Sequence, residues 1–538
     1  MKRHSRIRLA LAFVGVVLVL AVLAATSHAQ VYTELHNFNW HQEGANPDYP
    51  ALLAQGQDGN LYSTLPSQLN ADGSVFSSTP GGSVAGLYFF GGNDGNAPQS
   101  GLSLGFDGYF YGTTEEGGAA RKGNVFKFGA GGMTPLYEFQ DGTDGAYPWA
   151  TPIQAPDGNI YGVTNNGTNQ GRIYKITPSG VFSVIAIAPS ETVAPLVLAN
   201  DGNMYGTTPY GGTSNQGTVF QLTTKGKLKV IHSFGADGLH PSGPVLQAAD
   251  GKLYGTTPWG GTSGEGTVWV MTTGGGGYKV LHNFTGPEGE NPSSGLVQGS
   301  DKFLYSVAST DSANGAGTLF KISTNGKTFS VLYNFNKVSG GYTPLGTPMI
   351  HTNGTIYGVT LTGGTQFPAY GVLYSFNNNL KPFASLVVIW SGKIGTQVGI
   401  LGQGFSSATG VKFGTGPGTF TVLSDTYMVA SPAAGATTGI VTVLEPGGNL
   451  VSIQTFKVLP TISSFSPTSG PVGTSVVITG ASLSQTTAVT FGGVKATSFT
   501  VNSDTQVTAV VPTNAKTGKI GITTPGGKAT STKTFTVQ

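Results

Sequence analysis

The sequence predicts an all-β protein: a seven-bladed β-propeller followed by two immunoglobulin-like β-sandwich domains. The composition supports this, since 84 Gly and 30 Pro with only 10% charged residues are typical of many strands joined by turns. One element, Asp-Gly-Asn-x-Tyr-Gly-Thr-Thr with variations, recurs seven times. After about residue 385 this element stops, and short alternating strands with Gly-rich turns begin.

The repeat has the length of one propeller blade. Successive tyrosines of the element are separated by 49, 50, 44, 49, 51 and 52 residues. A period near 49 residues suits a four-stranded blade and is long for a solenoid coil. The tyrosines are Tyr62, Tyr111, Tyr161, Tyr205, Tyr254, Tyr305 and Tyr357.

Each period contains four strand signals. An apolar segment after a proline precedes LYGTT, which is followed by a segment of the GTVFK type and one of the LHNF type. Asp-Gly between the first two predicts a tight hairpin, because Gly tolerates positive φ. The third segment is apolar on both faces, so we expect it to be covered on both. Its second position is aromatic and is expected in the blade core: Phe126, Tyr174, Phe220, Trp269, Phe320 and Tyr374.

Two segments are candidates to complete the last blade. YTELHNF, at residues 32–38, precedes the first blade, and Phe383 to Val388 follows the last one. Closing the ring removes exposed strand edges without disulfides, and the chain has no Cys.

Several segments resemble known families. GNLYGTT, GG, GTVFK and DGxxP together resemble the Gloeo/Verruco tandem repeat of exported bacterial proteins, over about residues 31–385. From Pro460, the run PTISSFSPTSGPVGTSVVITG resembles the IPT/TIG immunoglobulin-like domain, and residues 395–458 resemble a weaker copy. We therefore expect a propeller at 30–385 and sandwiches at 386–458 and 459–538, which the resemblance implies are spacer or adhesive units.

Residues 1–29 have the pattern of a secretory signal peptide. Four basic residues precede an apolar run that ends in a small-x-small pattern near Ala29; a retained membrane anchor is the alternative. Removal leaves 23 basic residues against 25 acidic ones, so no charge excess favours nucleic acid or an acidic membrane. We expect a monomer that is secreted or held at the cell surface or in the periplasm, without membrane insertion after signal removal.

Long, variable loops are predicted to collect on one propeller face, where function is usually placed. That face is rich in aromatic rings, which suit stacking on the apolar faces of sugars. The alternative is that the rings fold back and fill gaps between blades. The candidate ligand-binding residues are Trp40, His41, Tyr147, Trp149, Tyr210, His240 and Trp259, with Tyr49 in the same set of loops.

An acidic residue stands four positions before the inter-blade proline in six of the seven copies. These could face a ligand, and Asp144, Asp237 and Glu288 join the candidate site on that ground. The alternative is that each acid accepts backbone N–H bonds in its own turn. Repetition favours the alternative, because catalysis needs two special carboxylates. The set is Glu43, Asp94, Asp144, Glu191, Asp237 and Glu288, with Gly340 in the seventh copy.

No catalytic or cofactor motif is present. His36, His232 and His282 occupy a fourth-strand position that holds Tyr in other copies, which indicates half-buried side chains and not metal ligands. The sequence lacks H-E-x-x-H and G-x-S-x-G, and its Asp-Gly-Asn turns lack EF-hand spacing. A propeller followed by an immunoglobulin-like domain is similar to copper radical oxidases, but their Tyr–Cys cofactor needs a Cys. We therefore expect no cofactor and no metal.

These observations favour an exported binding or adhesion protein that contacts a polysaccharide or cell-surface glycan. The alternatives are an extracellular polysaccharide lyase or hydrolase that uses loop carboxylates, and a purely structural surface protein. Binding is favoured over catalysis because no asymmetric catalytic set stands out.

Overall fold

The computed structural model describes residues 30–45, 47, 52–67, 71–165, 170–337, 340–364 and 370–538. The expected signal peptide and Tyr49 lie outside these residues. Within them, the helical segments are two short 3-10 turns, η1 (Gly286–Glu288) and η2 (Phe405–Ser407). The prediction of an all-β protein is confirmed.

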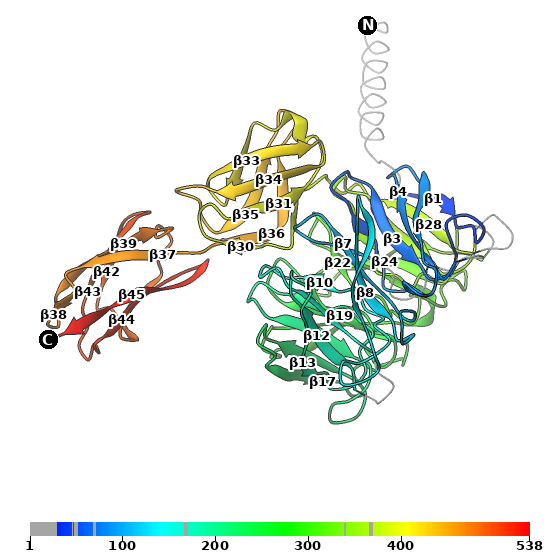
Figure 1. Ribbon diagram of the computed structural model, residues 1–538, viewed down its shortest axis with the longest axis horizontal. Helices are drawn as coiled ribbons and strands as arrows, with labels where there is room; N and C mark the ends of the chain where they lie inside the picture. Colours follow the sequence, from blue (N-terminus) through cyan, green and yellow to red (C-terminus); the bar gives the residue numbers. More distant parts are fainter. Residues whose placement is uncertain are drawn as a thin grey trace, which may run out of the picture.

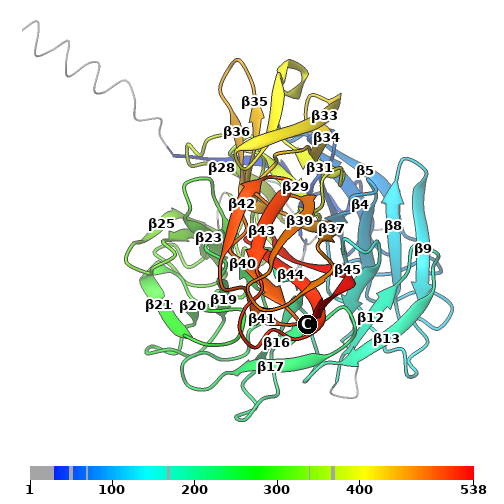
Figure 2. The same ribbon diagram turned by 90° about the vertical axis from the view of Figure 1, so that its left-hand side faces the viewer.

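Seven four-stranded antiparallel sheets occupy the described chain between Val31 and Asn377. Figures 1 and 2 show them side by side around a common axis, and we call them sheets 1 to 7 and, together, the ring. The first strand of each sheet has only two residues, and first strands of neighbouring sheets touch, as β2 does β6. The first strands therefore line the axis.

Sheets 1 to 6 each consist of four consecutive strands. Sheets 1 and 2 hold β2 (Ala54–Gln55), β3 (Leu61–Leu65), β4 (Ser74–Ser78), β5 (Val84–Phe89), and β6 (Ser103–Leu104), β7 (Phe110–Thr114), β8 (Asn124–Gly129), β9 (Gly132–Glu138). Sheets 3 and 4 hold β10 (Ile153–Gln154), β11 (Ile160–Val163), β12 (Arg172–Ile176), β13 (Phe182–Ile187), and β14 (Val197–Leu198), β15 (Met204–Thr208), β16 (Thr218–Leu222), β17 (Leu228–Ser233). Sheets 5 and 6 hold β18 (Leu246–Gln247), β19 (Leu253–Thr257), β20 (Thr267–Met271), β21 (Lys279–Asn283), and β22 (Val297–Gln298), β23 (Leu304–Ala308), β24 (Thr318–Ile322), β25 (Phe329–Asn334).

Sheet 7 joins the two ends of the ring. It contains β26 (Met349–Ile350), β27 (Ile356–Thr360) and β28 (Val372–Asn377), and its fourth strand is β1 (Val31–Asn37). β1 runs antiparallel to β28, with Glu34 opposite Tyr374. Of the two closing segments considered, YTELHNF completes this sheet, whereas β29 (Ser385–Val387) pairs outside the ring.

A glycine lies opposite the third-strand aromatic in sheets 2, 3, 4, 5 and 7, which explains the Tyr-Gly-Thr-Thr motif, whereas Ser63 and Ser306 take this place in sheets 1 and 6. In sheet 5, Gly255 pairs with Trp269, and a Cβ on Gly255 would lie 2.3 Å from Trp269 Cζ2. The large ring therefore needs a neighbour without a side chain. Trp269 is 0% exposed and packs with Tyr205, Val219 and Phe234 of sheet 4, which confirms its predicted place in the core between sheets. The same pairing occurs at Gly112–Phe126, Gly162–Tyr174, Gly206–Phe220 and Gly358–Tyr374.

The tyrosine of the motif is held by the aspartate of the preceding turn. In sheet 5, Asp250 accepts the Tyr254 hydroxyl (2.8 Å) and the Lys252 N–H (3.1 Å). Sheets 1 to 6 repeat the Tyr-to-Asp bond, at Tyr62, Tyr111, Tyr161, Tyr205, Tyr254 and Tyr305. The repeated aspartate of this turn is therefore committed to the fold.

Glutamines at the ends of first strands connect neighbouring sheets. Gln247 accepts the N–H of Asn200 (2.7 Å), and Gln55 accepts the N–H of Thr352 (3.0 Å) across the ring closure. The same kind of bond occurs at two further junctions, where Gln154 accepts the N–H of Phe106 and Gln298 accepts the N–H of Ala249. Side-chain amides thus join sheets that share no strand.

Two further β units follow the ring (Figure 1). The first unit is an eight-stranded sheet: β29, β30 (Ser391–Gly392), β31 (Val398–Leu401), β32 (Gly410–Phe413), β33 (Gly416–Ser424), β34 (Tyr427–Pro432), β35 (Gly439–Leu444) and β36 (Leu450–Val458). The second unit has one sheet of β37 (Thr461–Ser466), β39 (Ser475–Ala481), β42 (Phe499–Ser503) and β43 (Gln506–Val510). Its other sheet holds β38 (Ser469–Gly470), β40 (Ala488–Phe491), β41 (Val494–Lys495), β44 (Gly518–Thr524) and β45 (Gly527–Val537).

The first unit docks on the face of the ring that carries the Asp-Gly turns, which we call the turn face. Thr426 Oγ1 donates to the carbonyl of Gln57 (2.7 Å), and Lys457 Nζ donates to the carbonyl of Asn200 (2.5 Å). Tyr427 of the unit packs near Leu104 and Phe106 of sheet 2. These contacts span several sheets, so part of this face of the ring is covered by the chain itself.

Candidate functional site

The opposite face, which we call the loop face, is built by the connections from second to third strands and from one sheet to the next. Because all four strands of a sheet are antiparallel, these connections lie away from the turn face. The predicted site residues Trp40, His41, Tyr147, Trp149, Tyr210, His240 and Trp259 all fall in them.

Three of the predicted residues come together where sheets 4 and 5 meet. The ring centroid of His240 lies 4.9 Å from that of Tyr210 and 5.7 Å from that of Trp259. Tyr210 is 43% exposed and Trp259 48% exposed, values unusual for rings of this size. The three rings form an open aromatic cluster, which we call the aromatic triad.

Backbone bonds hold the triad in place. Leu239 N–H donates to the Trp259 carbonyl (2.8 Å), and His240 Nδ1 lies 2.7 Å from the Pro209 carbonyl oxygen. Gly260 has a φ of 87°, and a Cβ there would lie 2.8 Å from the backbone of Gly238. The loops are therefore fixed by their own main chains, which leaves the rings preorganised for contact.

Trp40 and His41 lie elsewhere, where sheets 7 and 1 meet. Trp40 is 36% exposed and packs edge-on against Tyr370, with ring centroids 5.4 Å apart. His41 is exposed, and its backbone N–H donates to Asn39 Oδ1 (2.8 Å). These two residues do not join the triad.

Tyr147 and Trp149 lie between sheets 2 and 3. Lys122 Nζ donates to the Tyr147 hydroxyl (2.9 Å) and lies 4.9 Å from the centre of its ring. Lys122 also pairs with Asp141, and the two hydrogen bonds raise its pKa. Trp149 is partly buried. Neither ring is presented as openly as those of the triad.

The carboxylate of Asp144 serves its own turn. It accepts the N–H groups of Gln140 (2.8 Å) and Gly142 (3.0 Å) and the hydroxyl of Tyr137 (3.0 Å). Tyr137 stands at the fourth-strand position that alternates between His and Tyr. The acid therefore ties the inter-sheet turn to the outer strand of its sheet.

The other two acids of the candidate site have similar partners. Asp237 accepts the N–H of Gly235 (3.1 Å). Glu288 accepts the N–H of Thr285 (3.1 Å) and lies 2.9 Å from His282 Nε2. Burial lowers the pKa of His282, so the imidazole is held neutral beside this carboxylate. Each of the three predicted acids thus has a structural task on the loop face.

A separate acidic group, which sequence reasoning missed, lies where sheets 5 and 6 meet. Burial, Asp311 and Glu265 raise the pKa of Glu290 to about 7. A Cβ on Gly286 would lie 3.4 Å from Glu290 Oε1 and 3.9 Å from Glu265 Oε2, so these two carboxylates converge. Glu265 belongs to the same loop as Trp259. The one available signal was departure from the repeat, since the matching loop of sheet 4 reads Asn-Gln-Gly where sheet 5 has Gly-Glu-Gly.

Over the described ranges, no group of three His, Cys, Asp or Glu side chains is arranged to hold a metal ion. In the same part of the chain, no helix is long and apolar enough to cross a membrane.

The solved structures similar to this chain are distant. A fungal alcohol oxidase of the AA5 family, in complex with copper, is 14% identical, with 94% of this chain and 100% of that one covered and a TM-score of 0.46. A putative 6-phosphogluconolactonase from Bacteroides uniformis is 14% identical (54% and 85% covered, TM-score 0.40). A surface glycan-binding protein from Prevotella bryantii is 15% identical (28% and 38% covered, TM-score 0.23). No curated protein matches the chain.

The family models match the two parts of the chain that the sequence motifs single out. The Gloeobacter/Verrucomicrobia repeat matches residues 21–194 and 191–423, and the IPT/TIG domain matches residues 460–537. Together the repeat matches cover well over half of the chain. The chain belongs to the Gloeobacter/Verrucomicrobia repeat family and carries an IPT/TIG domain at its C-terminal end.

Proposed function

We propose that the protein is an exported binding protein that contacts a carbohydrate through its loop face. In this proposal, residues 1–29 are a signal peptide and residues 30–385 form a closed seven-bladed propeller. Residues 386–458 and 459–538 are immunoglobulin-like sandwiches that act as spacers. The protein works as a monomer that is secreted or held at the surface or in the periplasm.

The aromatic triad carries the proposal. Sugar rings combine apolar faces with hydroxyl groups, and they are bound by exposed aromatic rings beside polar groups. Tyr210 and Trp259 supply such rings, and His240 lies between them. The hydrogen bond of His240 to the Pro209 carbonyl uses Nδ1, so Nε2 is not part of that bond. Glu265 and Glu290 place hydrogen-bond acceptors near the same loop.

Coverage of the turn face supports this orientation. The first C-terminal unit occupies the turn face through Thr426, Lys457 and Tyr427. The loop face therefore points away from both C-terminal units, as an adhesive surface at the end of a spacer requires.

The test is a screen of the purified protein against soluble and insoluble polysaccharides, followed by calorimetry on the best ligand. Tyr210→Ala and Trp259→Ala should each weaken binding by about 1–3 kcal/mol, the loss typical of an aromatic stacking platform. Tyr109→Ala is the matched control, because Tyr109 is 40% exposed but lies in a turn of the turn face. Equal losses in all three variants would contradict the proposal.

Glu290 supports a second candidate function, cleavage of a polysaccharide. A carboxyl group with a pKa of about 7 is protonated for part of the time at neutral pH, as a general acid must be, and the side chain of Glu265 converges with that of Glu290. In this case Glu290→Gln abolishes the release of sugar ends from the bound polysaccharide. Glu288→Gln, in the turn-bound acid, is the control and keeps the activity. A binding protein releases no sugar with either variant.

A further inference from the structure

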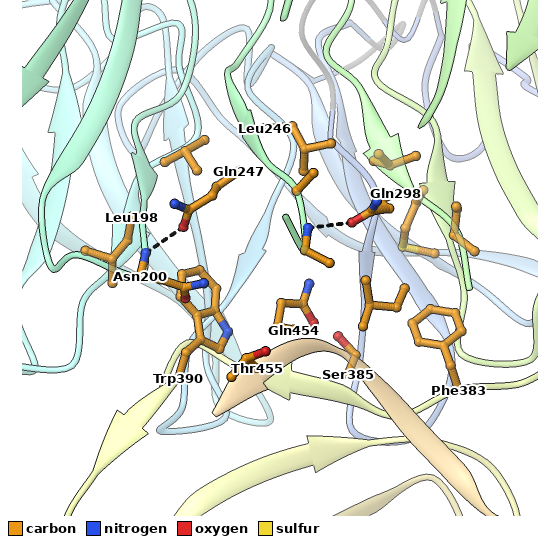
Figure 3. A pocket seen from close by; sticks show the side chains of 17 residues that line it. Leu198, Asn200, Leu246, Gln247, Gln298, Phe383, Ser385, Trp390, Gln454 and Thr455 are labelled. Carbon is orange, nitrogen blue, oxygen red and sulfur yellow. Dashed lines mark hydrogen bonds between the residues drawn. The ribbon is translucent and has the colours of Figure 1, made fainter. Parts of the chain in front are cut away.

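A cavity of about 270 Å³ lies on the turn face, between the axis of the ring and the first C-terminal unit (Figure 3). Its ring side comes from the first strands of sheets 4 to 7, at Leu198, Leu246, Val297 and Ile350. Its other side comes from the connection after the ring and from β36. The cavity thus lies in the junction between the ring and the unit and is separate from the loop face.

No charged side chain lines this cavity. Its polar side chains are amides, hydroxyls and one indole, and the rest are apolar. A charged ligand would lose its hydration here without gaining a counter-charge, which is strongly unfavourable. Occupants must therefore be uncharged.

Trp390 supplies a hydrogen-bond donor that the protein does not use. Its indole Nε1 is buried and has no acceptor among the described groups. Trp390 also borders a second cavity of about 260 Å³, next to Pro156 and Thr224, so its ring stands between the two spaces. Buried N–H groups are almost always paired, so an acceptor from outside the protein is expected here.

The remaining polar groups are held in fixed positions. Gln247 and Gln298 accept backbone N–H groups of the preceding sheets through Oε1, at 2.7 Å and 2.8 Å. Their Nε2 atoms donate to the carbonyls of Gly251 and Lys302. Figure 3 shows Gln454 and Thr455 of the C-terminal unit on the side of the cavity where Trp390 lies. One wall is therefore apolar, and the opposite wall offers an indole N–H, an amide and a hydroxyl.

We propose that this cavity binds an uncharged sugar of about one ring, either a free monosaccharide or the end of a neutral glycan. A sugar ring places an apolar face on Leu246, Val297 and Ile350, and its hydroxyl oxygens accept the Trp390 N–H. The volume matches a small ligand and excludes a long chain. This site is independent of the aromatic triad, which lies on the opposite face.

The test is fluorine NMR of the purified protein labelled with 5-fluorotryptophan. The chain has five Trp, and Trp390→Phe identifies the resonance of Trp390. Neutral methyl hexosides should shift that resonance saturably, whereas the corresponding uronic acids should not shift it. A neutral disaccharide that binds equally well would identify a chain end as the ligand, and one that fails would identify a monosaccharide.

Calorimetry on variants tests whether the Trp390 donor holds the ligand. Trp390→Phe replaces the indole with a smaller aromatic ring that has no donor, and it should weaken hexoside binding about tenfold. Tyr109→Ala, which lies on the turn face outside the cavity lining, should leave hexoside binding unchanged. The proposal is overturned if no methyl hexoside shifts the Trp390 resonance, if uronic acids shift it equally, or if Trp390→Phe binds as tightly as the unaltered protein.

Discussion

The turn face and the loop face of the ring are built from the same repeat but differ in how they use it. On the turn face, the aspartate and tyrosine of the first six copies bond to each other, as Asp250 and Tyr254 do. That face is partly covered by the first C-terminal unit. On the loop face, the copies diverge, and the exposed rings of Tyr210 and Trp259 come together where sheets 4 and 5 meet.

The comparison shows that repetition marks structure in this chain and that departure from repetition marks the candidate site. Five of the six recurring acids accept backbone N–H bonds in their own turns, namely Glu43, Asp94, Asp144, Asp237 and Glu288. Of the carboxylates that converge, Glu290 has no acidic counterpart in the other copies, and Glu265 has one in the first copy, Asp72. The predictions below test this division.

Removal of residues 30–37 should have the largest effect. The deletion takes away β1 and exposes the hydrogen-bonding edge of β28, to which β1 pairs over six residue pairs. We expect aggregation, which light scattering measures, and loss of the cooperative unfolding transition, which calorimetry measures. An unchanged transition and a monodisperse sample would contradict closure by β1.

Truncation of two tryptophans of sheet 5 should separate the core from the loop face. Trp269→Ala should lower the free energy of unfolding by about 3–5 kcal/mol, because it empties a fully buried site. Trp259→Ala should change it by less than about 0.5 kcal/mol, as is usual for exposed positions. Denaturant unfolding measures both, and similar losses would show that Trp259 fills a gap between sheets.

Glu290 should have a smaller, pH-dependent effect. Its pKa is raised to about 7 in the folded protein, above the ordinary value of 4.5, so folding favours its protonated form. Its contribution to stability is therefore fully present below pH 4.5 and is lost as the pH rises to 7. When the pH is raised from 5 to 8, the melting temperature of Glu290→Gln should fall less than that of the unaltered protein. If the melting temperatures of the two proteins fall equally with pH, Glu290 does not lie close to Asp311 and Glu265.

Local patterns in the sequence predicted much of the fold. Apolar segments of set spacing and the Asp-Gly turns located the strands, and the aromatic residue of the third strand located the core at Trp269. The grouping of Tyr210, His240 and Trp259 followed in part, since all three fall in loops of one face. Their contact depends on the bridge between Leu239 and Trp259, which no local pattern announces.

Features that depend on distant pairs were not predicted. The bond from Thr352 to Gln55 joins residues at opposite ends of the ring, and the glutamines look like ordinary strand ends in the sequence. Docking of the first C-terminal unit depends on side chains such as Lys457 that reach carbonyls of unrelated turns. The pKa of Glu290 depends on three loops that meet only in the folded chain.

The most direct test of the division between the two faces is a paired measurement on Trp259→Ala and Tyr109→Ala. The two rings are exposed to similar extents, 48% and 40%, but lie on opposite faces. For each variant, glycan affinity is measured by calorimetry, and melting temperature is measured on the same sample. We expect Trp259→Ala to lose about 1–3 kcal/mol of binding free energy and Tyr109→Ala to lose none, with melting temperatures unchanged in both. A lower melting temperature and unaltered affinity for Trp259→Ala would contradict the account.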